Sequence, residues 1–401
     1  MERPAMRPNL CSMCSDAAPT AFRDGRVRVF QLARRANACI LAVGGELKAS
    51  ACFYAGVEAA LTEPVGNLTD PRTYRTFIAL IDELARQWHF RPEVVAHDLH
   101  PRYLSTQYAE GTGLRRIGVQ HHHAHIVAVM AEWRQEKPVV GICCDGVGYG
   151  SDGAAWGCEV LYGDAADFSR ASHLEYFPLI GGDAAAVETC RPAAALLRQA
   201  FGGEWRGHLT PSFEDVPPAE LELFERLMTG PARSPLTSSL GRVFDGVSFL
   251  LGLCARNERE AQAAIALDSA AANAAAEPYP YETTADNGSI KMSTAPTIRA
   301  IVQDVRAGVG ADVISARFHE TIARMLAATA EMACERHGVA TVVLSGGCFA
   351  NQRLRARLIE RLERRHLRVL SPRLVSCGDA ALALGQAAAA AARLERAGGC
   401  V

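Results

Sequence analysis

Apolar residues in this chain form short runs that end in glycine, separated by longer segments with helical spacing. Residues 38–45 (ACILAVGG) and 139–144 (VVGICC) are such runs, and residues 340–344 (ATVVL) are rich in β-branched side chains before Ser-Gly-Gly. Runs of this length predict buried strands that enter tight turns. Two shorter strands are expected at residues 93–96 and 368–370.

Helical spacing of apolar residues fills the segments between these strands. Amphipathic helices are predicted at residues 72–88 and 314–337, and a further helix is expected from His122 to Trp133. From Arg191 onward the pattern is mostly helical and ends in an Ala-rich helix. Strands, glycine turns and helices that alternate in this way are typical of an α/β fold.

The length of 401 residues predicts more than one core-forming unit. We expect a first lobe at residues 38–170 and a second, mostly helical lobe at residues 171–392, with tails at residues 1–37 and 393–401. Residues 270–300 are rich in Ala, Pro, Asn and Thr. They are therefore expected to form an insertion or an exposed linker.

Composition narrows the class of protein. A formal net charge of −2 argues against nucleic-acid binding, which needs a basic surface. No apolar run approaches the roughly 18 residues of a membrane span. The N-terminal residues contain no apolar signal segment, and the 13 cysteines are then expected to be reduced thiols, so a cytoplasmic protein is predicted.

Four of the twelve histidines lie in the segment His-His-His-Ala-His at residues 121–125. On a helix, positions i and i+4 project from one face, so His121 and His125 are candidate ligands of one metal ion. The alternatives are a polar start of a helix and a chance cluster of histidines. Two imidazoles are too few for a metal site, so further ligands, expected to be carboxylates, must come from elsewhere.

Asp145 follows a predicted buried strand and opens a glycine-rich segment that includes Gly146, Gly148 and Gly150. An Asp at the end of a strand is well placed to ligate a metal, and glycines let the backbone approach phosphate oxygens. The alternative interpretation is a glycine-rich turn with a structural Asp.

Two further strand ends carry candidate residues for a nucleotide. Gly346 and Gly347 lie between a strand and a helix that begins near Asn351, an arrangement that suits a nucleotide at a helix N-terminus. Lys48 follows the turn after residues 38–45 and offers a cation. Strand–Gly-Gly–helix is common, so this signal is weak when taken alone.

Other motifs predict less. Cys11 and Cys14 form a CxxC without a second pair, so a four-Cys zinc site is not expected. The sequence has neither a GxxxxGK[ST] P-loop nor a GxSxG elbow. Cys143 and Cys144 lie in a predicted buried strand, where most cysteines are inert.

These segments together resemble the C-terminal carbamoyltransferase (Kae-like) region of the [NiFe]-hydrogenase maturation factor HypF. The resemblance extends over residues 38–390. It is carried by LAVGGELKAS (41–50), VVAHDLHPRYLST (94–106), VQHHHAHIVAVMAE (119–132), CDGVGYGSDGAAWGCEV (144–160), FPLIGGDAAAVE (177–188), TSSLGRVFDGVSFLLG (237–252), EAQAA (260–264), LSGGCFANQRL (344–354) and GDAALALGQA (378–387).

The resemblance implies a two-lobed fold of the actin/Hsp70-like ATPase class, related to the tRNA threonylcarbamoyltransferases, with a nucleotide and a metal between the lobes. Carried over by motif, the ligands of one Fe or Zn ion would be His121, His125, Asp145 and Asp379. The nucleotide contacts would be Asp245, Glu260, Gly346, Gly347 and Asn351. The phosphate side would be formed by Lys48, Gly146, Gly148 and Gly150.

The family reaction starts from carbamoyl phosphate and ATP, from which a separate YrdC-like domain makes carbamoyl adenylate. The resemblance implies that this chain passes the carbamoyl group to the C-terminal cysteine of a HypE-type acceptor. The resulting thiocarboxamide is dehydrated to a nitrile, the source of the cyanide ligand of the hydrogenase iron.

Several positions depart from the family pattern. Val147 replaces Thr in DGTGYG, Ala261 replaces Gly in EGQA, and Gly378, Ala380 and Ala381 stand in the final NDGG. The acylphosphatase-like, zinc and YrdC-like regions of full-length HypF are not represented in this sequence, so activated carbamoyl is expected to come from another protein. Two alternatives stay open: an O-carbamoyltransferase acting on a small-molecule hydroxyl, and a non-catalytic nucleotide-binding paralogue or scaffold.

Overall fold

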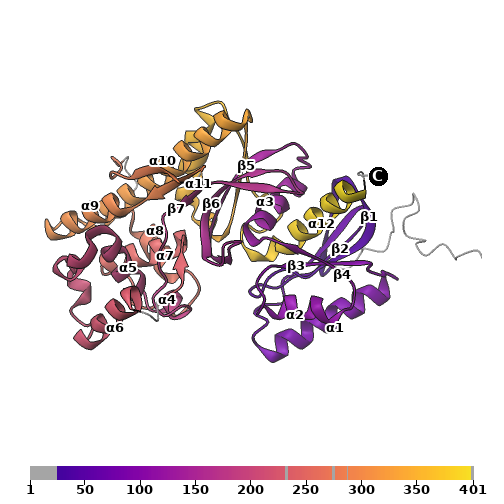
Figure 1. Ribbon diagram of the computed structural model, residues 1–401, viewed down its shortest axis with the longest axis horizontal. Coiled ribbons are helices and arrows are strands. Elements are labelled where there is room, and N and C mark those ends of the chain that lie inside the picture. The colour runs from indigo at the N-terminus through magenta and orange to yellow at the C-terminus, as the bar shows by residue number, and fades with distance from the viewer. Residues whose placement is uncertain (1–24, 231–233, 273–275, 287, 399–401) are drawn as a thin grey trace, which may run out of the picture.

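Two helix-covered β-sheets divide the molecule into two lobes (Figure 1). The computed structural model describes residues 25–230, 234–272, 276–286 and 288–398. The CxxC segment and most of the predicted N-terminal tail lie outside the described residues. Among the residues described, no helix combines the length and the apolar character needed to cross a bilayer.

The first sheet has the strand order β2-β1-β3-β4, in which β2 runs antiparallel to β1 and the other neighbours are parallel. Its strands are β1 (Val27–Ala42), β2 (Cys52–Thr62), β3 (Val94–Asp98) and β4 (Arg115–Val119). The amphipathic helix α1 (Pro71–Gln87) buries Phe77 and Leu84 against one face of the sheet. The Ala-rich helix α12 (Leu382–Gly398) packs on the opposite face.

The second sheet has the strand order β10-β11-β7-β6-β5-β12-β13, with the short pair β8 and β9 attached to β6. Its strands are β5 (Val139–Tyr149), β6 (Ala155–Gly163), β7 (Phe168–Leu174), β8 (Phe177–Pro178), β9 (Leu236–Thr237), β10 (Glu282–Asp286), β11 (Ser289–Ser293), β12 (Thr341–Ser345) and β13 (Arg368–Leu370). One of its faces shares a large apolar core with the helices of the second lobe.

Those helices cluster around the second sheet, on the left of Figure 1. They are α4 (Ala184–Val187), α5 (Cys190–Phe201), α6 (Pro218–Thr229), α7 (Leu240–Leu250), α8 (Gln262–Ala270), α9 (Ala295–Arg306), α10 (Ala311–His337) and α11 (Gln352–Glu363). Helix α2 (Leu104–Gly111) belongs to the first lobe. The long α10 packs against both α11 and the second sheet.

Helix α3 (His121–Glu132) lies between the two sheets and is buried along almost its whole length. It packs against α12 on one side and against β5 and β12 on the other. Gly385 of α12 makes the first contact possible, because a Cβ at this position would overlap the Ala124 carbonyl of α3. Gly141 of β5 has the same role beneath the Ile126 side chain.

The sheets do not follow the predicted lobe boundary at residue 170. Strands β5 to β7 belong to the second sheet because β5 pairs with β12; the paired residues Val140 and Val342, for example, are far apart in the sequence. Helix α12 returns to cover the first sheet, although the second lobe was predicted to extend to residue 392. Such long-range pairing leaves no local pattern, so hydrophobic periodicity does not reveal it.

Two predicted irregular segments are strands. β1 begins at Val27, inside the predicted tail 1–37. Its pairing with β2 has register shifts between Gln31 and Ala36 and between Ala36 and Ile40, and these interrupt the alternation of buried and exposed positions. Part of the predicted insertion 270–300 forms the β10–β11 hairpin, which extends the second sheet through β7. The glycine-rich segment after Asp145 is also a strand: β5 continues to Tyr149, with a register irregularity between Cys144 and Gly148.

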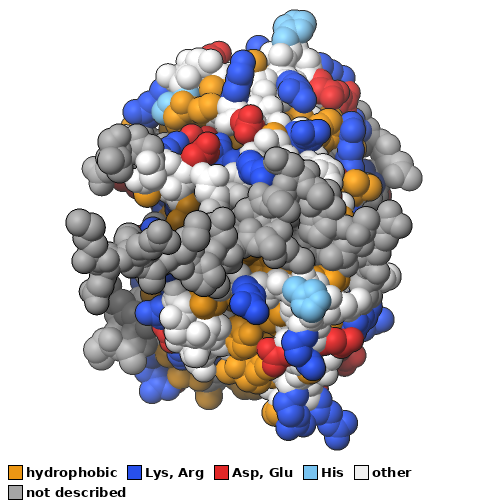
Figure 2. Space-filling model, turned by 90° about the vertical axis from the view of Figure 1, so that its right-hand side faces the viewer, with side chains coloured by type: hydrophobic (Ala, Val, Ile, Leu, Met, Phe, Trp, Pro, Cys, Tyr) orange, Lys and Arg blue, Asp and Glu red, His pale blue; other side chains and the backbone are white. Residues whose placement is uncertain are grey.

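The surface of the first lobe carries charges of both signs. In Figure 2, which faces the right-hand side of Figure 1, blue basic side chains are more prominent than red acidic ones, and orange apolar side chains lie among them. The chain as a whole has a nearly balanced count of 42 basic and 44 acidic residues.

Candidate metal centre and nucleotide cleft

The structure brings the four predicted metal ligands together. One ligand atom from each of His121, His125, Asp145 and Asp379 lies within 4.8 Å of the others. Asp145 Oδ2 is 3.3 Å from His121 Nε2 and 3.4 Å from His125 Nε2. Asp379 Oδ1 is 3.8 Å and 3.5 Å from the same two nitrogens. Both imidazoles therefore face both carboxylates.

Three different elements position these side chains. His121 and His125 are one helical turn apart at the start of α3, whose N-cap residue Gln120 accepts a hydrogen bond from the His123 backbone N at 2.9 Å. Asp145 lies on β5 where its pairing with β6 becomes irregular. Asp379 begins a short 3-10 helix that leads into α12. The packing of α3 between the two lobes is what joins these elements.

Charge pairing dominates the electrostatics of this group. Burial alone lowers the pKa of His121, but the charges of Asp98 and Asp145 outweigh it and raise this pKa well above its ordinary value. Burial likewise lowers the pKa of His125, and Asp145 and Asp379 together raise it. Burial raises the pKa of Asp145, yet the two imidazoles hold it well below its usual range.

The four residues fit a divalent metal ion. Both ring nitrogens of His125 are buried without a hydrogen-bond partner, an arrangement that costs free energy unless something else binds there. Two imidazole nitrogens and two carboxylate oxygens are a ligand set suited to Fe(II) or Zn(II), and they leave positions open for a substrate. A metal bound here would be held by His121, His125, Asp145 and Asp379.

The predicted nucleotide segment at Gly346 and Gly347 is attached directly to this group. The Gly347 backbone N donates to Asp145 Oδ1 at 3.0 Å, and the Gly346 backbone N donates to the Cys377 carbonyl at 2.8 Å. Gly346 has φ +101°, and a Cβ there would overlap the Cys144 backbone. Both N–H groups are already bonded, so these glycines have no free backbone donor for a nucleotide. The missing side chain of Gly346 lets its backbone lie close to that of Cys144.

Lys48 reaches from the first lobe to the second. Its Nζ lies 2.7 Å from Glu260 Oε1, which precedes α8, and both side chains are exposed at about half or more of their surface. Burial lowers the pKa of Lys48, but the hydrogen bond and charge of Glu260 outweigh it and raise this pKa. The predicted phosphate-side cation and the predicted nucleotide contact therefore bind each other across the two lobes.

Two other predicted nucleotide contacts are already engaged within the protein. Asp245 is 1% exposed and lies 2.7 Å from Arg242 on α7. Asn351 caps α11 by accepting from the Leu354 backbone N at 2.8 Å, and its Nδ2 lies 2.9 Å from His319 Nε2. Asp245 Oδ2 pairs with Arg242, but Asp245 Oδ1 is buried without a hydrogen-bond partner, whereas the Asn351 amide is engaged on both sides.

The glycines after Asp145 differ in what they permit. A Cβ on Gly148 would lie 2.6 Å from the His121 and His122 rings, and a Cβ on Gly150 would overlap Trp156. A Cβ on Gly146 meets nothing within 4 Å. Gly148 thus allows the backbone to lie against the histidines, whereas Gly146 borders open space. Val147, a departure from the family pattern, is 40% exposed beside it.

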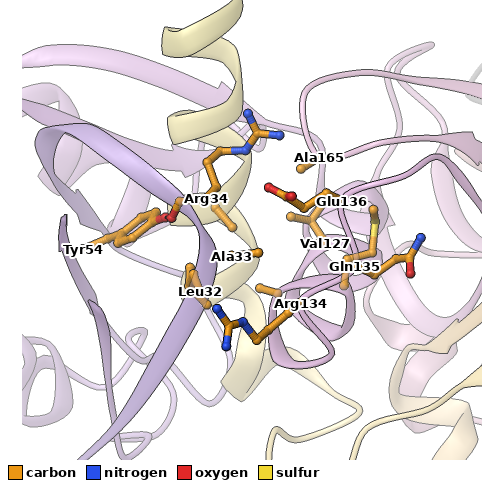
Figure 3. A pocket seen from close by; sticks show the side chains of 12 residues that line it. Leu32, Ala33, Arg34, Tyr54, Val127, Arg134, Gln135, Glu136 and Ala165 are labelled. Atoms are coloured by element: carbon orange, nitrogen blue, oxygen red, sulfur yellow. The ribbon is translucent and has the colours of Figure 1, made fainter. Parts of the chain in front are cut away.

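A small cavity lies away from these residues, between the irregular part of β1, α3 and α12. It encloses about 30 Å³ and has mostly apolar walls, with Arg34, Arg134 and Glu136 around it (Figure 3). None of the predicted site residues lines it. The candidate site, where the two lobes meet, is therefore distinct from this cavity.

Local sequence reasoning missed three residues that surround the site. Asp98 contacts His121, His319 contacts Asn351, and Arg242 pairs with Asp245. Asp98 and Arg242 lie inside the segments AHDLHP and SLGRVFD that carried the family resemblance. Those motifs were the available signal for both, whereas His319 lies in an ordinary helical pattern.

Fold and site together define a class. A two-lobed α/β molecule with a buried His₂Asp₂ group beside glycine segments at the lobe junction is of the actin/Hsp70-like type, as predicted. Comparison with solved structures confirms this fold: the crystal structure of full-length HypF in the phosphate- and nucleotide-bound form matches with a TM-score of 0.88 at 36% identity. The match covers 92% of this chain and 57% of that one.

The chain belongs to the HypF carbamoyltransferase family. The family described as the HypF Kae1-like domain matches residues 35–132, and the carbamoyltransferase, Kae1-like domain, second subdomain, matches residues 141–386. The two matches meet between α3 and β5, where the chain passes from the first sheet to the second.

Relatives of two lengths match the chain. A carbamoyltransferase HypF homolog of Cupriavidus necator is 39% identical over 367 residues, which cover 88% of this chain and 92% of that protein. The carbamoyltransferase HypF of Synechocystis is 34% identical over 368 residues, covering 86% of this chain but 46% of that protein. The chain thus spans about half the length of the longer HypF relatives.

Proposed function

We propose that this chain transfers a carbamoyl group from carbamoyl adenylate to the C-terminal cysteine of a HypE-type acceptor, in the synthesis of the cyanide ligand of [NiFe]-hydrogenase. One observation carries the proposal. The buried group of His121, His125, Asp145 and Asp379 lies directly beside the Gly346–Gly347 segment in a chain of the HypF family. This arrangement supports a metal site beside a nucleotide-binding segment.

The side chains where the two lobes meet would have different roles in this reaction. A divalent metal held by the four ligands would supply Lewis acidity toward a carbamoyl or phosphate oxygen. Lys48, half-exposed at the mouth of the junction, would exchange Glu260 for the phosphate of the adenylate. Asp145 orients the Gly347 backbone through its second oxygen, so the metal group and the nucleotide segment hold a fixed distance.

The transfer needs no nucleophile from this chain. The thiolate of the acceptor attacks the carbamoyl carbon, a C–S bond forms, the C–O bond to the phosphate breaks, and AMP leaves with its negative charge. Burial raises the pKa of the Cys143, Cys144 and Cys348 thiols well above the ordinary value, so these neighbours of the site stay protonated. The acceptor's own thiolate is then the reactive sulfur.

Because this sequence matches the Kae1-like regions of HypF, we infer that a YrdC-like protein supplies carbamoyl adenylate. The test mixes the purified chain with an HypE-type acceptor, ATP and carbamoyl phosphate, with and without a YrdC-containing protein. Intact-mass spectrometry then weighs the acceptor. We expect a carbamoyl adduct on its terminal cysteine in the complemented mixture alone.

Two other outcomes have defined meanings. An adduct formed without the YrdC-containing protein means that the chain activates carbamoyl phosphate itself and overturns the inferred supply. No adduct in either mixture, with metal and nucleotide still bound, contradicts the acceptor and favours a small-molecule hydroxyl or a scaffold role. A His125→Ala control, which removes one predicted ligand, is expected to abolish the adduct.

A further inference from the structure

Asp98, the last residue of β3, is buried against the metal group without belonging to it. Its side chain is fully buried, and both carboxylate oxygens are bonded. Oδ2 lies 2.8 Å from His121 Nδ1, and Oδ1 accepts from the His100 backbone N at 2.9 Å. The carboxylate thus connects the end of the first sheet to the first histidine of α3.

The bond to Asp98 determines which nitrogen of His121 can bind a metal. An ionised carboxylate can only accept, so His121 Nδ1 carries the hydrogen. The lone pair available for a metal is then on Nε2, the atom that faces Asp145 at 3.3 Å and Asp379 at 3.8 Å. His125 has no such help, because its Nδ1 is buried without a hydrogen-bond partner.

We propose that Asp98 is a positioning residue of the metal centre, which holds the His121 ring in the Nδ1–H form with Nε2 aimed at the other three ligands. The inference rests on the metal centre of the proposed function. Carboxylates that accept from the second nitrogen of a ligating histidine fix the ring and raise its basicity, and their loss weakens metal binding by about 10–100-fold.

Asp98→Asn is a sharp variant because an amide has one acceptor and one donor. The oxygen at the Oδ1 position must face the N–H of His100, so the amide NH₂ group is left facing His121 Nδ1. A donor at that position favours the His121 tautomer with hydrogen on Nε2, which cannot ligate. The substitution therefore keeps the size of the side chain and reverses the direction of one hydrogen bond.

Thr106→Val is the matched control. Thr106 Oγ1 donates to the Asp98 backbone carbonyl at 3.2 Å and is almost fully buried. Valine has the same shape, so this variant removes a hydrogen bond from the same turn and leaves the Asp98 carboxylate in place. Metal affinity is measured by titrating the metal-free full chain with Zn²⁺ against a chromophoric chelator. Visible absorption of Co²⁺ reports the ligand set.

We expect Asp98→Asn to weaken Zn²⁺ binding by about 10–100-fold and to change the Co²⁺ spectrum, while Thr106→Val stays within about twofold of the wild type. Failure of the wild type to bind either metal would overturn the proposed metal centre itself. Wild-type affinity in Asp98→Asn would overturn the role of Asp98 alone. Equal losses in both variants would also overturn it, because the turn and not the carboxylate would then matter.

The wild-type protein offers a second measurement in case Asp98→Asn does not fold. Nitrogen-15 NMR of the Zn²⁺-loaded chain distinguishes protonated from metal-bound imidazole nitrogens. We expect His121 to show a protonated Nδ1 with slow hydrogen exchange and a metal-bound Nε2. A metal-bound Nδ1 in His121 would overturn the inference.

Discussion

Ala261 has a backbone conformation that the family pattern reserves for glycine. It precedes α8 with φ +57° and ψ +20°, in the left-handed region, and its side chain is exposed. A non-glycine residue there costs roughly 1–2 kcal/mol, part of which is offset because alanine restricts the unfolded chain. We expect Ala261→Gly to raise the free energy of unfolding by about 1 kcal/mol, measured by urea denaturation.

The control for this substitution lies within α8, the helix that Ala261 precedes. Ala264→Gly removes the same methyl group from regular helical backbone and is expected to lower the free energy of unfolding by about 1 kcal/mol. Opposite signs identify the left-handed conformation as the cause. Equal signs for the two variants would contradict it.

Gly148 and Gly146, both in the glycine-rich part of β5, differ in how close an added Cβ would come to the histidines. We expect Gly148→Ala to reduce bound metal strongly, since its Cβ would press on the His121 ring at 2.6 Å. Gly146→Ala meets open space and is expected to retain the metal. Metal content by mass spectrometry after gel filtration checks both variants. Full metal content in a folded Gly148→Ala protein would show that the ring can move without loss of binding.

At the scale of elements, His319 couples α10 to α11. Its Nδ1 bonds to the Ser315 carbonyl at 2.8 Å, and its Nε2 lies 2.9 Å from Asn351 Nδ2, the capping residue of α11. Burial lowers the pKa of His319, so the folded state favours the neutral ring. A proton on His319 Nε2 would place an N–H donor directly opposite the NH₂ donor of Asn351.

The sign of the pH effect follows from that lowered pKa. The stability from neutral His319 is complete above the unfolded-state value of about 6.5 and is lost as pH falls below it, because the unfolded chain then binds the proton. We expect His319→Leu to be less stable at pH 8, with a shallower decline between pH 6.5 and 5 in urea denaturation. Parallel declines in variant and wild type would contradict this assignment.

The contact of α12 with α3 depends on a single missing side chain. We expect Gly385→Ala to lower the free energy of unfolding by about 3 kcal/mol, because its Cβ would force the helix away from the Ala124 carbonyl. Gly207→Ala, whose Cβ meets nothing within 4 Å, is the control and is expected to change stability little. Urea denaturation measures both, and a tolerated Gly385→Ala would mean that α12 can shift without cost.

Several elements were predictable from local pattern and several were not. The helix expected at residues 72–88 is α1, because its apolar residues have helical spacing, and the strand expected at residues 340–344 is β12, because it is a short run of β-branched apolar residues. The start of β1 was missed, because its buried and exposed positions do not alternate regularly. The pairing of β5 with β12 was also missed, because it depends on residues far apart in the sequence.

Part of the candidate site could likewise be predicted from local sequence, and part could not. The spacing of His121 and His125 predicts one shared face, and the structure shows it. Asp379 follows no local signal and came from the family motif alone. The mutual pairing of Lys48 with Glu260 was not predictable either, because it exists only once two lobes meet.

At the scale of the whole molecule, Lys48 and Glu260 connect the lobes through an exposed ion pair. Such pairs contribute little to stability, so we expect Lys48→Met to leave the unfolding midpoint nearly unchanged. If Lys48 serves the phosphate of a nucleotide, the same variant lowers ATP affinity by about tenfold or more in equilibrium dialysis. Glu260→Gln is the control variant, because it keeps Lys48 and removes the charge of its partner. Unchanged ATP binding in Lys48→Met would contradict the role of Lys48.

The return of α12 to the first sheet has a consequence for how the protein is made. Strands β1 to β4 are synthesised before the helix α12, which packs on one face of their sheet, and Asp379 is synthesised just before α12. Until the second lobe has been made, that face lacks α12, and the group of His121, His125 and Asp145 lacks its fourth member. A metal ion that requires all four residues would therefore bind only after the second lobe has been synthesised.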